Sequence, residues 1–206
     1  MRPDTTRPLG RTKLPVCQMG FGAAPLGNLY ASFSDEEARA TVTAAYDAGI
    51  RLFDTAPLYG YGLSEHRVGE ALRWQPRDSY ILSTKVGRLL RPEDPAKIDG
   101  GLFMRTLPFD PYYDYSYDGV MRSVEDSLQR LALQRIDVLL IHDVDHWTHG
   151  SAEAVDQRFA EVMEGGYRAM LKLREEGVVT ALGAGVNEWE MCQRFAEAGD
   201  FDCFLL

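Results

Sequence analysis

Short apolar segments alternate with helical segments along this 206-residue chain. We expect strands at residues 19–22, 50–54, 80–85, 136–141, 178–184 and 201–206. These segments are apolar on both faces, and strands of that kind are buried on both sides, as in a parallel sheet covered by helices. The pattern therefore predicts an α/β protein with one parallel sheet.

The segments between these strands show helical spacing of apolar residues. Ser34 and Glu37 form a capping box, which predicts the start of a helix that ends at Gly49. Ser64, followed by Glu65, predicts the start of the next helix. Further helices are expected over 117–132, over 152–176 with an interruption at 165–166, and over 188–198. Each predicted helix links two strands, as parallel pairing requires.

Four polar residues stand where successive predicted strands end, and they decide between two topologies: Asp54, Lys85, His142 and Asn187. In a (β/α)8 TIM barrel these ends ring a single mouth, where active sites lie. In an open doubly wound sheet they would be strung along an edge, away from one switch point. We therefore predict the barrel. Eight βα units need about 250 residues, whereas this sequence supplies about five and a half. We expect the barrel to be C-terminally incomplete, and to be completed by chain beyond Leu206 or by another element.

The rest of the layout indicates a single domain over residues 1–206. An N-terminal hairpin is expected over 6–17, with its turn at Gly10–Lys13. Residues 87–117 are rich in proline, glycine and aromatic residues and have no sustained period. A surface excursion is one interpretation of that segment. We favour a long loop over a binding pocket, because aromatic residues are unusual in disordered segments.

Composition narrows the function classes. The net charge of −9 and the pI near 4.9 disfavour a nucleic-acid partner, since phosphate contacts need a basic face. The three cysteines form no paired framework, so we expect reduced thiols and a cytoplasmic location. No apolar run reaches about 18 residues, so no membrane span is expected.

The segment D-T-A-P-L-Y places Asp54 at a strand end and Tyr59 in the loop that follows. A tyrosine with its ordinary pKa of about 10 is a poor acid or base near neutrality. We expect Lys85, held by Asp54, to lie close to the phenol and to lower its pKa by about 1–3 units. The three residues would then form a group tuned for proton transfer.

Five segments resemble the aldo-keto reductases: G-F-G-A-A-P-L-G-N at 20–28, D-T-A-P-L-Y-G-Y-G-L-S-E-H-R-V-G-E-A-L at 54–72, S-T-K-V-G at 83–87, I-D-V-L-L-I-H-D at 136–143 and L-G-A-G-V-N-E-W at 182–189. The resemblance covers the whole chain in the right order. Two of these segments are most similar to the branch of L-fucose and D-threo-aldose dehydrogenases, which includes pyridoxal 4-dehydrogenase-like enzymes.

The resemblance implies a (β/α)8 barrel, NAD(P) as cofactor and hydride transfer to or from a sugar or similar small hydroxy or carbonyl substrate. Oxidation of an aldose at C1 to a lactone is the reaction it favours. The family's catalytic tetrad corresponds to Asp54, Tyr59, Lys85 and His142, and Asn187 with Asp54 would contact the cofactor. The family pairs a serine with that asparagine, and here Val186 replaces the serine. Its diphosphate and adenosine loops follow the sixth strand, so only part of the dinucleotide site is expected here.

Two alternatives stay open at this stage. Relatives of this fold include NADPH-binding redox-sensing subunits with little turnover, which an intact tetrad does not exclude. His142, His146 and His149 could instead ligate a metal in a barrel hydrolase, although the stretch reads as a loop without the fixed geometry that tight zinc sites need. We expect no metal, and Trp147 in this stretch is predicted to line a substrate pocket. NAD versus NADP, the identity of the substrate and the oligomeric state are left open.

Overall fold

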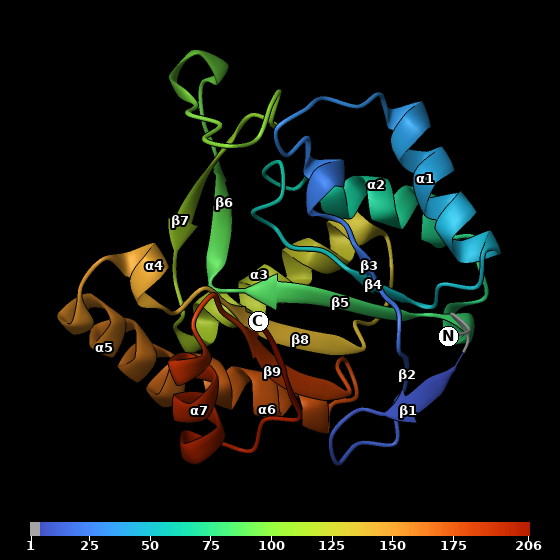
Figure 1. Ribbon diagram of the computed structural model, residues 1–206. Coiled ribbons are helices and arrows are strands. Elements are labelled where there is room, and N and C mark those ends of the chain that lie inside the picture. The colour runs from blue at the N-terminus through green and yellow to red at the C-terminus, as the bar shows by residue number, and fades with distance from the viewer. Residues whose placement is uncertain (1–4) are drawn as a thin grey trace.

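The computed structural model describes residues 5–206 and contains one curled, six-stranded parallel sheet in the order β10-β9-β8-β5-β4-β3 (Figure 1). Its strands are β3 (Phe21–Gly22), β4 (Leu52–Asp54), β5 (Ile81–Val86), β8 (Val138–His142), β9 (Ala181–Gly185) and β10 (Cys203–Leu205). Strands β5, β8 and β9 are buried throughout, as expected for strands covered on both faces. The α/β class and the incomplete barrel are confirmed.

The helices that cover the sheet are α1 (Asp35–Asp47), α2 (Leu63–Leu72), α3 (Tyr117–Leu131), α5 (Ala152–Glu161), α6 (Tyr167–Glu175) and α7 (Trp189–Ala198). The capping box before α1 is confirmed: Ser34 Oγ accepts from the Glu37 amide at 3.2 Å, and Glu37 Oε2 accepts from the Ser34 amide at 2.9 Å. Within residues 5–206, no helix is both long enough and apolar enough to cross a membrane.

Helix α2 begins at Leu63, one residue before the predicted start, but Ser64 does not cap it. The cap position is Gly62, with φ of 97°, and Ser64 lies inside the helix. The Ser64 hydroxyl instead donates to the Ala23 carbonyl at 2.7 Å. Glu65 is fully buried and forms an ion pair with Arg130 of α3 at 2.6 Å. Both residues therefore hold helices and strands together and do not cap the helix.

The segment 87–117 is not one irregular loop. It contains an antiparallel hairpin, β6 (Arg88–Pro92) and β7 (Phe109–Tyr113), which rises from the C-terminal end of β5 (Figure 1). All five residues of β7 are half-buried, so the sequence shows no alternation of apolar and polar positions. Prolines within both strands hid the pattern further. Only the turn between the strands, residues 93–108, is a long loop, with a 3₁₀ turn at Pro95–Lys97.

Gly165 and Gly166 interrupt the helical stretch 152–176 as a π-helical turn, Val162–Gly166, between α5 and α6. A Cβ on Gly165 would lie 2.8 Å from the Tyr117 amide nitrogen, and one on Gly166 would lie 2.5 Å from the Tyr115 carbonyl oxygen. Glycine is needed here because the turn packs directly on the backbone before α3.

The N-terminal hairpin is confirmed as β1 (Thr6–Pro8) paired with β2 (Pro15–Cys17). It lies at the end of the sheet opposite the β6–β7 hairpin (Figure 1). Leu9, Leu14 and Val16 of this segment pack on an apolar cluster formed by Ile81, Val138, Leu140 and Ala181. The hairpin therefore covers the N-terminal end of the strands.

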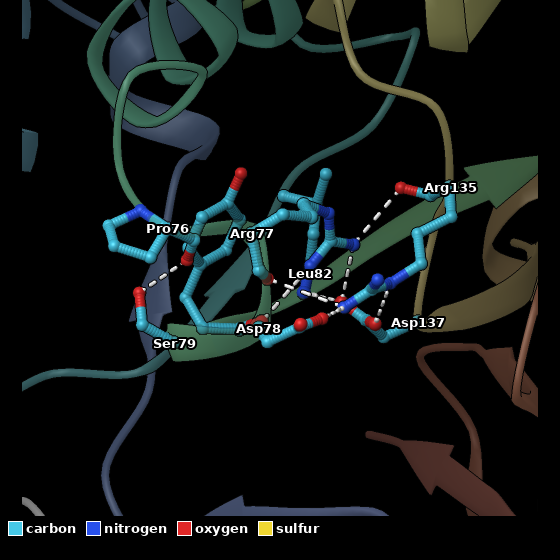
Figure 2. Close-up of polar contacts among 8 residues, drawn as sticks. Pro76, Arg77, Asp78, Ser79, Leu82, Arg135 and Asp137 are labelled. Carbon is cyan, nitrogen blue, oxygen red and sulfur yellow. Dashed lines mark hydrogen bonds and ion pairs between the residues drawn. The ribbon is translucent and has the colours of Figure 1, made fainter.

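An ion-pair network ties the starts of β5 and β8 together (Figure 2). Asp137 accepts from Arg77 at 2.6 Å and from the Leu82 amide at 2.7 Å. Arg135 lies 3.4 Å from the other Asp137 oxygen and also pairs with Asp78 at 2.6 Å. The Asp137 side chain is 5% exposed and that of Asp78 is 90% exposed. Asp137 is thus the buried centre of the network, and Asp78 lies on its rim.

Candidate active site

Asp54 and Lys85 meet at the C-terminal end of the sheet. Lys85 Nζ donates to Asp54 Oδ2 at 2.6 Å and to the Thr55 carbonyl at 2.9 Å, and its side chain is 2% exposed. Ser83 Oγ donates to the other Asp54 oxygen at 2.9 Å. Burial lowers the pKa of Lys85, but Asp54 and Tyr59 more than reverse this, so the pKa lies above its ordinary value. The ammonium therefore remains charged in a buried position.

Tyr59 lies beside this ion pair. The Lys85 ammonium is 4.8 Å from the centroid of the Tyr59 ring. The loop that carries Tyr59 packs on the 3₁₀ turn Ala24–Gly27, and a Cβ on Gly27 would lie 2.4 Å from the Tyr59 carbonyl carbon. Gly60 makes the same close approach from the other side, with φ of 65°. The small residues at 23–28 thus let two backbones touch, which fixes where Tyr59 stands.

The expected lowering of the Tyr59 pKa is wrong for this structure. Burial raises the pKa of Tyr59 above its ordinary value, and the opposing effect of Lys85 is smaller. The charge of Asp54 raises it further. The phenol is therefore protonated near neutral pH, and Lys85 limits the rise without reversing it.

His142 ends β8 and completes the group. Its ring lies 5.9 Å from the Tyr59 ring, edge to face, and its side chain is 5% exposed. The buried Tyr115 hydroxyl donates to the His142 carbonyl at 2.6 Å and so holds the strand end in place. Burial, Lys85 and Arg88 hold the pKa of His142 well below its ordinary value. The imidazole is therefore neutral near pH 7 and can donate from one nitrogen.

Of these residues, Tyr59 lines a pocket of about 430 Å³. Its lining combines polar side chains with aromatic and apolar ones: Ala24, Leu29, Tyr30, Leu58, Tyr59, Arg88, Leu102, Phe103, Tyr113, Asp143, Trp147, Thr148 and Asn187. Backbone hydrogen bonds between 28–30 and 102–104 hold one wall, at 2.9 Å each. The predicted pocket segment does supply part of the lining. Trp147 stands at the rim, 83% exposed.

The family model for the aldo/keto reductase family matches residues 18–204, almost the whole chain. The chain belongs to the aldo/keto reductase family. It is 44% identical to pyridoxal 4-dehydrogenase of Microbacterium luteolum, over 100% of this chain and 62% of that protein. It is 40% identical to D-threo-aldose 1-dehydrogenase of a Pseudomonas species, over 94% of this chain and 57% of that protein. Both relatives are named for activities in the branch that the sequence predicted.

Solved structures agree with this assignment. An aldo-keto reductase from Bacillus halodurans, in its holo form, matches with a TM-score of 0.72 and 28% identity, over 97% of this chain and 56% of that one. A glycerol dehydrogenase from Gluconobacter oxydans matches with a TM-score of 0.70 and 29% identity, over 99% of this chain and 55% of that one. The chain thus spans about six-tenths of the length of the relatives and structures it matches.

In this aldo/keto reductase, Asn187 follows β9 and lines the pocket. Its side-chain nitrogen Nδ2 donates to Asp145 Oδ2 at 2.9 Å and lies 3.3 Å from Asp143 Oδ1. Within residues 5–206, its Oδ1 accepts no hydrogen bond. An oriented carbonyl acceptor of this kind fits the NH₂ group of a nicotinamide carboxamide. Val186, in place of the family's serine, is 4% exposed and brings no hydroxyl.

The histidines of the hydrolase alternative do not meet. His146 Nδ1 lies 3.1 Å from Glu188, and the His149 ring lies 4.7 Å from the Tyr113 ring, tilted by 58°. This stretch is also partly helical, as α4 (His146–His149), where a loop was expected. Among the residues that the structure describes, no three histidine, cysteine or acidic side chains stand in a metal-ligating arrangement. The spacing H-x3-H-x2-H therefore does not build a metal centre here.

Sequence reasoning missed two charged residues of the pocket, Arg88 and Asp143. Arg88 lies three residues after Lys85, and Asp143 follows His142 directly. Their side chains pair at 2.7 Å between Arg88 Nη2 and Asp143 Oδ2. The sequence indicated a pocket role for these two residues only through their positions just beyond barrel strands, because such residues lie at the mouth where ligands bind.

Proposed function

We propose that the protein is an NAD(P)-dependent oxidoreductase that moves a hydride between the nicotinamide and an aldose or similar small hydroxy or carbonyl substrate. Oxidation of an aldose at C1 to a lactone is the proposed reaction. The observation that carries this proposal is the buried Lys85–Asp54 pair, 2.6 Å long, beside the ring of Tyr59, which lines the pocket. Lysine side chains are almost never fully buried unless they are paired, so the burial of Lys85 beside Tyr59 needs the Asp54 partner.

Each residue has a proposed role. Tyr59 donates a proton to the carbonyl oxygen during reduction and accepts it from the hydroxyl during oxidation. Lys85 stabilises the phenolate, and Asp54 holds Lys85. Neutral His142 orients the substrate oxygen through an N–H donor. The nicotinamide, when bound, supplies or accepts the hydride, and Asn187 would hold its carboxamide.

The raised pKa of Tyr59 predicts different pH profiles for the two directions. Reduction needs the protonated phenol, so its kcat/KM should stay flat from about pH 6 to 9 and fall only above the phenol pKa. Oxidation needs the phenolate, so its kcat/KM should rise about tenfold per pH unit over the same range. Initial rates measured in both directions across this range test the prediction. An oxidation rate that levels off near pH 7 would contradict it.

The names of the relatives support a sugar or a pyridoxal-like substrate. Pyridoxal 4-dehydrogenase, D-threo-aldose 1-dehydrogenase and L-galactose dehydrogenase of Arabidopsis thaliana are 44%, 40% and 35% identical to this chain. Two of the three are named for sugars. We therefore place aldoses first and pyridoxal-like aldehydes second among the substrates to be tried.

The test is a dehydrogenase assay on the full chain with an aldose panel and pyridoxal, each with NAD⁺ and with NADP⁺. Formation of the reduced nicotinamide with at least one aldose, and formation of the lactone, is the expected result. Tight binding of the reduced cofactor without turnover on any substrate would instead favour a redox-sensing subunit of the same fold. Activity that depends on stoichiometric zinc would contradict the proposal altogether.

A further inference from the structure

The Arg88–Asp143 ion pair lies in the wall of the pocket, next to the candidate proton-transfer group. We propose that this pair is the specificity determinant that recognises hydroxyl groups beside the reacting carbon, and so selects neutral polyhydroxylated aldehydes. The inference rests on the proposed oxidoreductase function and adds the two residues that would choose the substrate.

The position of the pair is the first argument. Asp143 Oδ2 lies 3.3 Å from His142 Nε2, and the His142 ring lies 5.9 Å from the ring of Tyr59. Because His142 is neutral, this contact is not an ion pair. A substrate whose carbonyl lies between Tyr59 and His142 therefore has its neighbouring carbons within reach of Asp143 and Arg88.

Both side chains are held rigidly. The Arg88 guanidinium lies 5.0 Å from the centroid of the Tyr113 ring, and its side chain is 14% exposed. Asp143 has the left-handed backbone conformation, with φ of 54°, and its amide donates to the Gly185 carbonyl at 2.8 Å. A non-glycine residue in that conformation stores strain, which is common at binding sites. A preorganised pair loses little entropy when a ligand arrives.

The pair also has unused hydrogen-bonding capacity. A guanidinium has five N–H donors, and within residues 5–206 only Asp143 accepts from Arg88. Asp143 Oδ1 has one long contact, at 3.3 Å, to the Asn187 amide. A hydroxyl group both donates and accepts, so a carboxylate and a guanidinium side by side match two adjacent hydroxyls. An aliphatic aldehyde offers nothing to either residue.

The charge of this wall favours neutral over anionic substrates. Arg88 and Asp143 cancel each other, and the buried Asp145 adds a negative charge beside them. Burial and Asp145 raise the pKa of Asp143 above its ordinary value, although Arg88 opposes this. A further carboxylate or phosphate on the substrate would increase that repulsion. The pocket is therefore suited to uncharged sugars.

The experiment compares glyceraldehyde with propanal, which has the same carbon chain without hydroxyls, in the reduction direction with the full chain and its cofactor. The wild type should prefer glyceraldehyde by at least about tenfold in kcat/KM, because hydrogen bonds to charged groups are lost with propanal. In Arg88→Met, kcat/KM for glyceraldehyde should fall about 10- to 100-fold, and that for propanal less than about threefold. Asp143→Asn, which keeps the side-chain size, should shift the ratio in the same direction.

Arg91→Met is the matched control. Arg91 lies on the same strand, pairs with Asp110 and is 61% exposed, and it does not line the pocket. Its ratio of the two kcat/KM values should equal that of the wild type. Propanal turnover also reports on folding, since a purely structural role for Arg88 would lower both rates together. An unchanged ratio in Arg88→Met and Asp143→Asn would overturn the inference while the proposed function stands. Absence of turnover with every aldehyde in the wild type would overturn both.

Discussion

Replacing Tyr59 with phenylalanine is expected to lower turnover by about 10²- to 10⁴-fold, because the phenol is the proposed proton donor and acceptor. The ring would keep its packing on Phe103, at 6.2 Å, and its edge-to-face contact with His142. The loop position is fixed by the Gly27–Gly60 contact, which the substitution does not touch. Loss of activity should therefore occur without loss of the fold.

Two measurements separate chemistry from structure in Tyr59→Phe. Thermal unfolding should be within about 2 °C of the wild type, and steady-state kinetics should show the loss in kcat more than in KM. Tyr46→Phe is a suitable control, since its hydroxyl contacts Ser79 at 2.7 Å and neither residue lines the pocket. Undiminished activity in Tyr59→Phe would remove Tyr59 as the acid–base residue. Equal losses in both variants would point to a general effect of the missing hydroxyl.

The fold was predictable because its signal is carried by many residues. Strands such as Leu139–Ile141 are wholly apolar, and only a sheet covered on both faces satisfies such segments. The topology then followed from four polar residues at strand ends, which meet at one mouth only in a barrel. The structure brings Asp54, Lys85 and His142 around the Tyr59 ring at that end of the sheet, and Asn187 lines the same pocket as Tyr59.

The features that were missed depend on contacts between residues far apart in the chain. The β6–β7 hairpin has no clean alternation, because all of β7 is half-buried. Serine is a residue type that often caps helices, but the Ser64 hydroxyl donates to the Ala23 carbonyl, 41 residues away in the chain. Whether the pKa of Tyr59 shifts up or down depends on how deeply the ring is buried. The balance between burial and the charge of Lys85 cannot be found from the spacing of residues in the sequence.

Replacing Asp137 with alanine is expected to destabilise the protein by about 3–5 kcal/mol, the largest stability effect we predict. The carboxylate holds the buried Arg77 guanidinium and the Leu82 amide at the starts of β8 and β5 (Figure 2). Without it, a cation that is 10% exposed would lose its counter-charge and a strand amide would lose its acceptor. Arg77 Nε already has no partner among the residues described, so the site has little capacity to compensate.

Equilibrium unfolding in urea measures this effect, provided that the denaturant dependence of the two proteins is the same. Asp78→Ala is the matched control, because it removes an aspartate from the same network at a side chain that is 90% exposed. Exposed ion pairs contribute little, so its stability should barely change. Asp137→Asn should fall between the two, since an amide oxygen can still accept from Leu82 but carries no charge for Arg77. The network lies at the starts of the strands and the pocket beyond their ends, so Asp137→Ala that remains folded should keep the kcat of the wild type. A loss of kcat at temperatures where this variant is fully folded would mean that the two ends of the sheet are coupled.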